Sequence, residues 1–422
     1  MNALVIGSGG REHAIVKSLT ESKLVTKVFT SPGNAGTAQI SENIVLDLAH
    51  HQSVVQFCQI QSIQFVFIGP EAYLVDGLAD SLRAANILVV GPSKAASQLE
   101  GSKIFAKEFM KKAGVPTAHS IVVESVSSAL QAAKKMTAPY ILKADGLASG
   151  KGVFICKSEE ALEAAAKKLF VEKIFGAAGQ RALLEQNLPG SELSFMVLTN
   201  GSEYQMLPIA QDHKRLLNKN LGPNTGGMGT VAPVQIPGAL HLKIIQQIIE
   251  PTIAEIKKEN LLFYGVLFVG IMVVGDEPFA LEYNVRFGDP ETQVIIPLIK
   301  NDLGKIFYEL AKGNLEKLEF SKNSAVCIVN AAAAYPEPSL KEVPIQIPDY
   351  LLDGAYVLHA ATKKNADGRI YSSGGRVLNV IAVATDFKIA KGKALELNSK
   401  IIFSGRQFRT DIGDYQLQRK AT

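Results

Sequence analysis

Three polar side chains alternate with larger apolar ones in the stretch "FALEYNVRFGDPET", residues 279–292. Side chains two apart on a β-strand point to the same face, so Glu282, Asn284 and Arg286 share one face of the expected strand. Burying these groups together is costly without ligands of matching charge. The oxygens of Glu282 and Asn284 suit Mg²⁺, and the Arg286 guanidinium suits a carboxylate or phosphate. The alternative is an amphipathic edge strand with a surface Glu–Arg pair.

A glycine-rich turn separates two β-branched runs in "ILKADGLASGKGVFI", residues 141–155. It is not a P-loop, because Asp145 occupies the first glycine position of that motif and Gly152 follows Lys151. The turn can still bring backbone N–H groups close to an anion, with Lys143 and Lys151 supplying positive charge. The alternative is an ordinary hairpin with solvated lysines.

Two other segments indicate bound charge. Lys103 falls in the first turn of the expected helix "SKIFAKEF", where the helix dipole disfavours a cation unless an anion binds nearby. Residues 211–233 are glycine-rich with few charges, which favours a long loop whose backbone approaches a ligand. In that segment Asp212 and Lys214 are candidates to titrate or bind charge, whereas His213 is more simply a structural histidine.

The elements that position these side chains begin with a βαβ pattern. Near-continuous apolarity predicts a parallel sheet covered by helices, whose loops share the carboxyl edge where ligands bind. In the first loop, "GSGGRE", Glu12 stands where a dinucleotide-binding turn has its third glycine, which argues against a nicotinamide-dependent oxidoreductase. The expected strands are residues 3–6, 27–30, 65–68 and 87–90.

The rest of the chain divides into three further regions. A helix at 102–116 leads into a small α+β unit at 120–190, which has a hairpin around the glycine turn and could move as a lid. Residues 191–322 have the longer strands and the densest polar clusters, as expected of a catalytic body. The last hundred residues predict short strands at 343–347, 355–362, 368–373 and 376–383, then a helix at 386–400.

The composition favours a globular multidomain protein. The 422 residues are 47% apolar, and a chain of that length divides into several cores. Forty-four basic and forty acidic side chains leave a net charge of +4, which does not indicate a nucleic-acid partner. The three cysteines are too few and too far apart for a disulfide framework. No run approaches the ~20 apolar residues of a membrane span, and no signal peptide is evident. We expect a cytoplasmic protein that binds small molecules, without a membrane or nucleic-acid partner.

A set of motifs runs in order along the whole chain: "VIGSGGREHAI", "PGNAGTA", "GPEAYLVDGL", "QLEGSKIFAKEFM", "KADGLASGKGV", "QDHKR", "GPNTGGMG", "EYNVRFGDPETQ" and "GGRVLNV". It resembles the glycinamide ribonucleotide synthetase (phosphoribosylamine–glycine ligase) family of the ATP-grasp superfamily. That resemblance implies ATP-dependent joining of glycine to 5-phosphoribosylamine through glycyl phosphate, in purine synthesis. The products would be glycinamide ribonucleotide, ADP and phosphate, with Mg²⁺ or Mn²⁺ as the metal.

The resemblance also implies the fold, which is a multidomain α/β and α+β protein with an ATP-grasp centre. An open parallel α/β domain would span 1–101, and a small β-rich domain would span 323–422. Between them, residues 102–120 with 191–322 would form the central ATP-grasp domain and 121–190 its lid. We expect a monomer or a weak homodimer.

Residue roles follow from the same resemblance. The glycine loop would cover the ATP phosphates, the backbone at Glu185 would face adenine, and Glu192 would bind the ribose hydroxyls. Arg286, Asp289 and Lys143 are the catalytic candidates, and Glu282 with Asn284 would bind the metal. ATP would contact Lys103, Lys143, Gly146, Gly150, Lys151, Gly152, Glu185 and Glu192. The other substrates would contact Gly10, Arg11, Glu71, Asp212, Lys214, Arg286, Asp289, Lys363 and Arg376.

Three positions depart from the family pattern. Gln186 stands where a second acid is expected, the usual aromatic–serine pair is missing before Ala232, and Ala361 replaces a glycine. None of these removes charge from the proposed phosphate or metal sites. Two alternatives stay open, because each would share the nucleotide-binding residues. One is an ATP-grasp ligase that activates formate or bicarbonate, and the other is a nucleotide sensor without catalytic activity.

Overall fold

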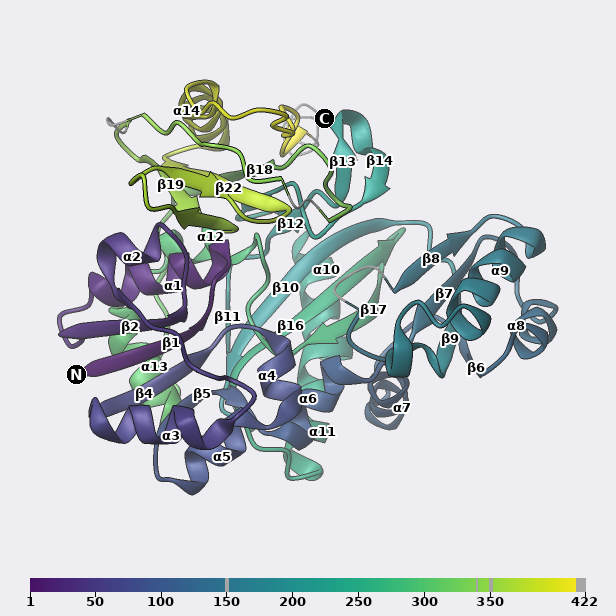
Figure 1. Cartoon of the computed structure of the whole chain (residues 1–422). Coiled ribbons are helices and arrows are strands. Elements are labelled where there is room, and N and C mark those ends of the chain that lie inside the picture. The colour runs from purple at the N-terminus through teal and green to yellow at the C-terminus, as the bar shows by residue number, and fades with distance from the viewer. Residues whose placement is uncertain (149–151, 339–340, 349–351, 415–422) are drawn as a thin grey trace.

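The computed structural model describes residues 1–148, 152–338, 341–348 and 352–414, and Figure 1 shows how they are arranged. Within these ranges a sheet of nine strands runs through the molecule, in the order β11-β10-β16-β5-β4-β1-β2-β3, with β17 also paired to β16. A four-stranded sheet and a five-stranded sheet lie on either side of a large cavity that this long sheet borders.

The amino-terminal half of the long sheet is parallel, which confirms the βαβ prediction. Residues 3–6 in its central strand have no exposed surface, as near-continuous apolarity predicts. Its strands are β1 (Asn2–Gly7), β2 (Lys27–Pro32), β3 (Glu42–Asn43), β4 (Ile63–Ile68) and β5 (Leu88–Pro92). Its helices are α1 (Gly10–Thr20), α2 (Thr37–Ile40), α3 (His51–Ile60), α4 (Glu71–Asp76), α5 (Leu78–Ala84) and α6 (Lys94–Gly101).

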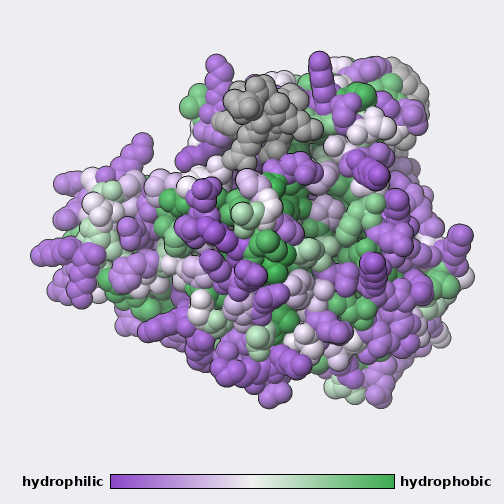
Figure 2. All heavy atoms as spheres, turned by 180° about the vertical axis from the view of Figure 1, so that it is seen from behind, coloured by the Kyte–Doolittle hydropathy of each residue, from purple (hydrophilic) through white to green (hydrophobic). Residues whose placement is uncertain are grey.

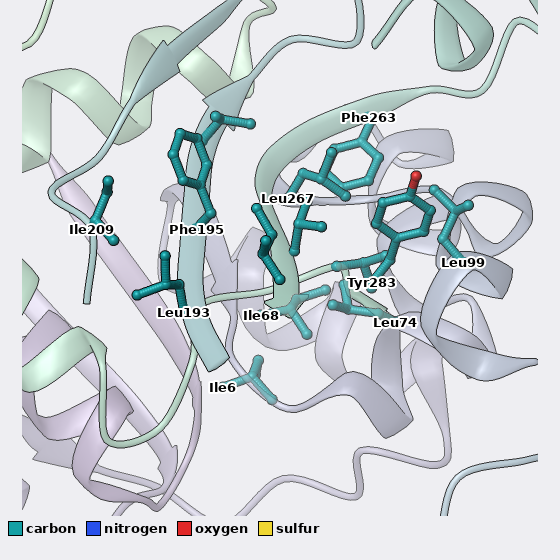
Figure 3. Packing of buried hydrophobic residues seen from close by; sticks show 14 of the residues in the cluster. Ile6, Ile68, Leu74, Leu99, Leu193, Phe195, Ile209, Phe263, Leu267 and Tyr283 are labelled. Atoms are coloured by element: carbon teal, nitrogen blue, oxygen red, sulfur yellow. The ribbon is translucent and has the colours of Figure 1, made fainter. Parts of the chain in front are cut away.

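An antiparallel half continues the same sheet, which the sequence patterns did not indicate. The junction is short, since β16 pairs with β5 only through Phe263 with Pro92 and Tyr264 with Gly91. Figure 3 shows Ile6 and Ile68 from the parallel half packed in one cluster with Leu267 from the antiparallel half. The strands are β10 (Ser191–Thr199), β11 (Tyr204–Met206), β16 (Phe263–Val274) and β17 (Glu277–Asn284). Two helices precede β16 in the chain, α10 (Gly238–Ile244) and α11 (Glu250–Lys258), and two follow β17, α12 (Thr292–Ile295) and α13 (Leu303–Ala311).

The predicted compact unit at 120–190 forms a separate four-stranded antiparallel sheet with its own hydrophobic cluster, on the right in Figure 1. Helix α7 (Lys103–Ala113) leads into it and ends at Gly114, whose φ of +72° is the left-handed cap expected there. The glycine turn joins β7 to β8, which confirms the hairpin. The elements are β6 (Ser120–Val123), α8 (Val126–Ala133), β7 (Tyr140–Ala144), β8 (Val153–Cys156), α9 (Glu159–Ala166) and β9 (Ala182–Gln186). We call this unit the lid.

The expectation of a long irregular loop at 211–233 is wrong, because short strands form in it. β12 (Gln211–Asp212) and β15 (Gly229–Ala232) join the carboxyl-terminal sheet, and β13 (Arg215–Leu217) pairs with β14 (Leu221–Asn224) as a hairpin. A Cβ on Gly229 would lie 2.6 Å from the Cys327 carbonyl oxygen. At least one glycine of the segment therefore permits strand pairing rather than ligand approach.

The five-stranded carboxyl-terminal sheet has the order β12-β15-β18-β22-β19, and α14 packs on it. The predicted strand at 343–347 is wrong, since this segment makes only isolated bridges through Pro344 and Gln346. Pro344 has no N–H to donate to a ladder. The other predicted segments form β19 (Ala355–His359), β20 (Thr362–Lys364), β21 (Ile370–Ser372), β22 (Arg376–Ala384) and α14 (Phe387–Ser399), with 355–362 ending at the first residue of β20. The sheet also contains β18 (Ser324–Ala331), which the sequence patterns did not indicate.

Hydrophilic side chains cover much of the rear face, and smaller groups of hydrophobic residues lie between them (Figure 2). Across the described ranges, none of the helices combines the length and apolarity that crossing a membrane requires.

Candidate active site

A cavity of about 700 Å³ opens where the lid, both halves of the long sheet and the carboxyl-terminal sheet meet. It brings together residues that lie more than a hundred positions apart, including Lys143 of the lid and Glu282 of β17. The sequence-predicted residues that line it are Arg11, Glu71, Lys103, Lys143, Gly152, Glu185, Glu192, Asp212, Lys214, Glu282, Asn284, Arg286, Asp289 and Arg376.

Three predicted residues do not line this cavity. Gly10 lies at the start of α1, against Asn379. A Cβ on Gly146 would lie 2.5 Å from the Ala178 Cβ, so this glycine packs inside the lid. Lys363 borders a separate hollow of about 220 Å³ and pairs with Glu342 at 2.6 Å. The other two residues predicted for the loop, Gly150 and Lys151, lie outside the described residues.

The alternation on β17 and beyond is confirmed. Tyr283, Val285 and Phe287 are buried in the hydrophobic core, where Tyr283 also borders the cavity, and Glu282, Asn284 and Arg286 line the cavity from the other face. The Tyr283 hydroxyl lies 2.7 Å from Thr252 Oγ1. A satisfied buried hydroxyl helps to hold the strand, and so the polar face, in one position.

Glu282 lies among several cations, and its carboxylate makes no hydrogen bond or ion pair within the described ranges. Burial acts to raise the pKa of Glu282, but Lys214, Lys143 and Lys103 outweigh it and lower the pKa. The carboxylate therefore stays charged and free to accept a ligand.

Arg286 lies between two carboxylates rather than beside Glu282. Its Nη2 is 2.7 Å from Glu100 Oε1, and its Nε is 3.2 Å from Glu71 Oε2. Glu100 also accepts a hydrogen bond from the Val285 backbone N–H at 2.8 Å. Burial raises the pKa of Glu100 to about 7, whereas Arg286 and Arg11 outweigh burial at Glu71 and lower its pKa to about 2. We call Arg286, Glu71 and Glu100 the arginine triad.

The lid end has the opposite arrangement, in which one carboxylate lies between two ammonium groups. Glu185 Oε2 is 2.8 Å from Lys143 Nζ, and Glu185 Oε1 is 3.3 Å from Lys107 Nζ. All three side chains are less than a tenth exposed. Burial acts to lower the pKa of both lysines; the pKa of Lys107 falls, whereas Glu185 and Glu282 raise that of Lys143. We call these residues the lysine triad.

The conflict at the start of α7 is resolved within the protein. The Asp145 carboxylate accepts hydrogen bonds from Ser102 Oγ at 2.8 Å and the Ile104 N–H at 2.9 Å. Its other oxygen pairs with Arg181 at 3.0 Å. Asp145 therefore supplies the negative charge at this helix terminus, and Lys103 does not require a bound anion there.

The segment after β12 contributes polar groups to the cavity. Lys214 Nζ lies 2.6 Å from Glu192 Oε1. Burial, followed by the charge of Glu291, raises the pKa of Asp212 well above its usual range. His213 is structural, as expected, because its ring bonds the Gly229 carbonyl oxygen and the Gly413 N–H.

The carboxyl-terminal sheet reaches the cavity through Arg376. Its Nη2 lies 3.2 Å from Asp289 Oδ2, and its Nη1 donates to the Gly226 and Asp289 carbonyl oxygens. Asp289 also accepts a hydrogen bond from Gln293 at 2.7 Å. Arg376 and Asp289 thus orient each other at the wall of the cavity.

The first loop, "GSGGRE", folds around the side chain of Glu12. Glu12 Oε2 accepts a hydrogen bond from the Gly9 N–H at 2.7 Å, and Glu12 Oε1 pairs with Arg11 at 2.5 Å. A Cβ on Gly7 or Gly69 would lie within 2.5 Å of the Glu12 side chain. A carboxylate therefore occupies the place that a dinucleotide pyrophosphate needs in such a turn.

Sequence reasoning missed Lys107 and Glu100. Lys107 had a usable signal, because it follows Lys103 by one helical turn and so shares its face. Glu100 had no such signal, since its partners Arg286 and Val285 lie far away in the sequence, just after β17.

Comparisons with known proteins identify the family. Models of the phosphoribosylglycinamide synthetase N domain, ATP-grasp (A) domain and C domain match residues 1–100, 101–292 and 325–415. Agrobacterium fabrum phosphoribosylamine–glycine ligase is 41% identical over 424 residues, which cover 100% of both chains. The crystal structure of phosphoribosylamine–glycine ligase from Thermotoga maritima is 35% identical with a TM-score of 0.86, covering 98% of this chain and 100% of that one.

The biotin carboxylase domain of Hydrogenobacter thermophilus 2-oxoglutarate carboxylase, solved with ADP, magnesium and bicarbonate, shares the fold alone. Its identity is 19% and its TM-score 0.73, with 96% of this chain and 91% of that chain covered. The fold is thus that of an ATP-grasp protein. The chain belongs to the phosphoribosylglycinamide synthetase family, which confirms the resemblance seen in the sequence.

Proposed function

We propose that the chain joins glycine to 5-phosphoribosylamine at the expense of ATP, giving glycinamide ribonucleotide, ADP and phosphate. The observation that carries this proposal is that Lys143 of the lid, Glu282 of β17 and Arg376 of β22 line one cavity. Cations facing an unpaired carboxylate suit a triphosphate with its metal. The acid and the amine are those of the similar phosphoribosylamine–glycine ligases.

The chemistry requires that the glycine carboxylate be activated. Transfer of the γ-phosphoryl group to a carboxylate oxygen releases ADP and forms glycyl phosphate. The amine nitrogen of phosphoribosylamine then attacks the acyl carbon, the carbon–oxygen bond breaks, phosphate leaves with the bonding electrons, and the nitrogen loses a proton. Catalysis needs mainly placement and a cationic environment around the transferred group.

The residues divide between the substrates by position. In the proposed site Lys103 and Lys143 contact the ATP phosphates, and Gly152 borders them. The backbone at Glu185 faces adenine. Glu192 binds the ribose hydroxyls once its ion pair with Lys214 is broken. Around glycine and phosphoribosylamine we place Arg11, Glu71, Asp212, Lys214, Arg286, Asp289 and Arg376.

The residues present fit Mg²⁺ or Mn²⁺ bound together with ATP. Glu282 offers a free carboxylate, and Asn284 an amide oxygen that now accepts from Arg286 at 3.1 Å. The described residues include no cluster of three or more potential His, Cys, Asp or Glu ligands. A divalent ion here would therefore complete its shell with water and phosphate oxygens, as Mg²⁺ commonly does. Once bound, it would neutralise charge on the phosphates.

The compartment is proposed from the cysteines. Cys58, Cys156 and Cys327 are all free and buried. Unpaired thiols are typical of a reducing environment, which supports the cytoplasm.

Two measurements test the reaction. Phosphate release is expected when ATP, Mg²⁺, phosphoribosylamine and glycine are mixed, and not when formate or bicarbonate replaces glycine. With glycine labelled by ¹⁸O in its carboxylate, one label should appear in the released phosphate if glycyl phosphate forms. Release without glycine contradicts the ligase, and unlabelled phosphate from labelled glycine contradicts the intermediate.

A further inference from the structure

Lys107 is a buried cation to which the proposed reaction gives no task. It is 8% exposed and lies on α7, one turn after Lys103. Its Nζ donates to Thr117 Oγ1 at 2.5 Å and to the Ala118 carbonyl oxygen at 3.4 Å. Lysines are almost never buried to this extent unless they are paired. Its charged partner is Glu185.

Glu185 divides its charge between two lysines. Each carboxylate oxygen faces a different ammonium group, Lys107 on one side and Lys143 on the other. Two positive groups and one negative group leave an uncompensated positive charge in the lysine triad. Because Lys143 and Lys107 both line the cavity, that charge is available to an anion bound in it.

The position of Lys107 is also tied to the strand that presents Glu282. Thr117 accepts a hydrogen bond from Lys107 and donates one to the Ala280 carbonyl oxygen at 2.6 Å. Ala280 lies two residues before Glu282 on β17. Through Glu185 and Thr117, Lys107 therefore connects β9 of the lid to β17 of the long sheet.

We propose that Lys107 is a positioning residue that acts through Glu185 to keep Lys143 available to the ATP phosphates. By forming an ion pair with Glu185 Oε1 at 3.3 Å, it prevents this carboxylate from fully neutralising Lys143, so the lid wall of the cavity stays positive. The inference rests on the proposed function, in which Lys143 contacts the triphosphate.

The test compares ATP binding with adenosine binding by calorimetry in the presence of Mg²⁺. Lys107→Met keeps the length of the side chain and removes its charge, and it leaves Lys143 closed in a one-to-one pair with Glu185. We expect the ATP Kd to rise about tenfold, the effect of ~1.4 kcal/mol, while the adenosine Kd changes less than about twofold. Lys107→Arg retains the charge and should bind ATP nearly as the wild type does.

Rescue distinguishes charge from packing. The double variant Lys107→Met/Glu185→Gln removes both the second cation and the carboxylate, so Lys143 is again uncompensated. We expect it to recover most of the lost ATP affinity, which a packing role would not allow. Glu185→Gln alone should bind ATP at least as tightly as the wild type. If Lys107→Met fails to fold, the ATP Kd of Glu185→Gln still tests the inference.

Each result decides between the alternatives. Equal weakening of ATP and adenosine, no recovery in the double variant, or weaker ATP binding by Glu185→Gln overturns the inference. Lys143→Met separates it from the proposed function. If Lys143→Met leaves the ATP Kd unchanged, the phosphate role of Lys143 fails. If it weakens ATP binding while Lys107→Met does not, only the inference fails.

Discussion

The two ends of the cavity have opposite charge arrangements. In the lysine triad Glu185 lies between two ammonium groups, and in the arginine triad Arg286 lies between two carboxylates. In each triad one charge lacks a partner of opposite sign. The unpaired charge is positive in the lysine triad, at the lid, and negative in the arginine triad, at the body. The end that should receive phosphates is thus cationic, and the other end suits the ammonium or amine of the remaining substrates.

The two triads also differ in how they hold their excess charge. Burial raises the pKa of Glu100 to about 7, so a proton can neutralise part of the arginine triad near physiological pH. In the lysine triad the net upward shift of the Lys143 pKa keeps that ammonium charged. The comparison therefore predicts that the body end responds to neutral pH through Glu100, whereas Lys143 at the lid end stays charged there.

The largest effect is expected between the two ends, at Glu282. Glu282→Gln removes the free carboxylate, which lies close enough to interact with Lys143 and Arg286. Because this carboxylate is the proposed metal ligand, turnover with saturating ATP and Mg²⁺ should fall at least about a hundredfold. Glu277→Gln on the same strand, where the acid pairs with Lys243, is the matched control and should keep its activity. Turnover within threefold of the wild type would remove Glu282 from the metal site.

Breaking the arginine triad should mainly affect stability. Arg286→Met leaves Glu71 and Glu100 without their shared cation, which we expect to lower the free energy of unfolding by ~3–5 kcal/mol. Urea unfolding followed by circular dichroism measures this loss, and Arg286→Lys is the control that retains the charge. The double variant Arg286→Met/Glu100→Gln should recover part of the stability. An unchanged urea midpoint for Arg286→Met would mean that the charge of Arg286 does not stabilise the folded protein.

Breaking the lysine triad should mainly affect ATP. Lys143→Ala removes a charge-assisted contact worth ~1.5–3 kcal/mol, which corresponds to roughly ten- to a hundredfold weaker ATP binding. Lys167→Ala, which removes an exposed lysine from the same lid, serves as control for general lid damage. An unchanged ATP Kd for Lys143→Ala would contradict the assignment of phosphates to this end.

The smallest effect is a change in pH dependence. Glu100 has a raised pKa, so the folded state holds its proton more tightly than the unfolded state and stability falls as pH rises from about 4.5 through 7. Glu71 has a lowered pKa, so its contribution is present above about 4.5 and is lost only as pH falls towards 2.

Glu100→Gln should therefore lose less stability than the wild type between pH 5 and 8, by roughly a few degrees in Tm. Melting curves at several pH values in this window measure the difference. Glu71→Gln should reduce this slope by a smaller amount, because the charge of Glu71 raises the pKa of Glu100 less than burial does. Parallel profiles for the wild type and Glu100→Gln would show that Glu100 does not titrate in this window.

Local patterns predicted the parts of the site that lie on single elements. Alternation placed Glu282, Asn284 and Arg286 on one face, and the glycine turn predicted a hairpin with Lys143 on its incoming strand. The same reasoning was wrong about 211–233, because the short strands β12 and β15 gain their stability from the carboxyl-terminal sheet rather than from their own propensity.

The sequence by itself determined which side chains share a face, where glycine relieves the backbone, and which family the ordered motifs resemble, because all three are properties of neighbouring residues. Only the tertiary structure decided that Lys107 and Lys143 share Glu185, and that Glu71 and Glu100 share Arg286. Pairing between distant segments depends on sheet order and register, which local periodicity does not encode. The sign of the charge left at each end of the cavity follows from that pairing.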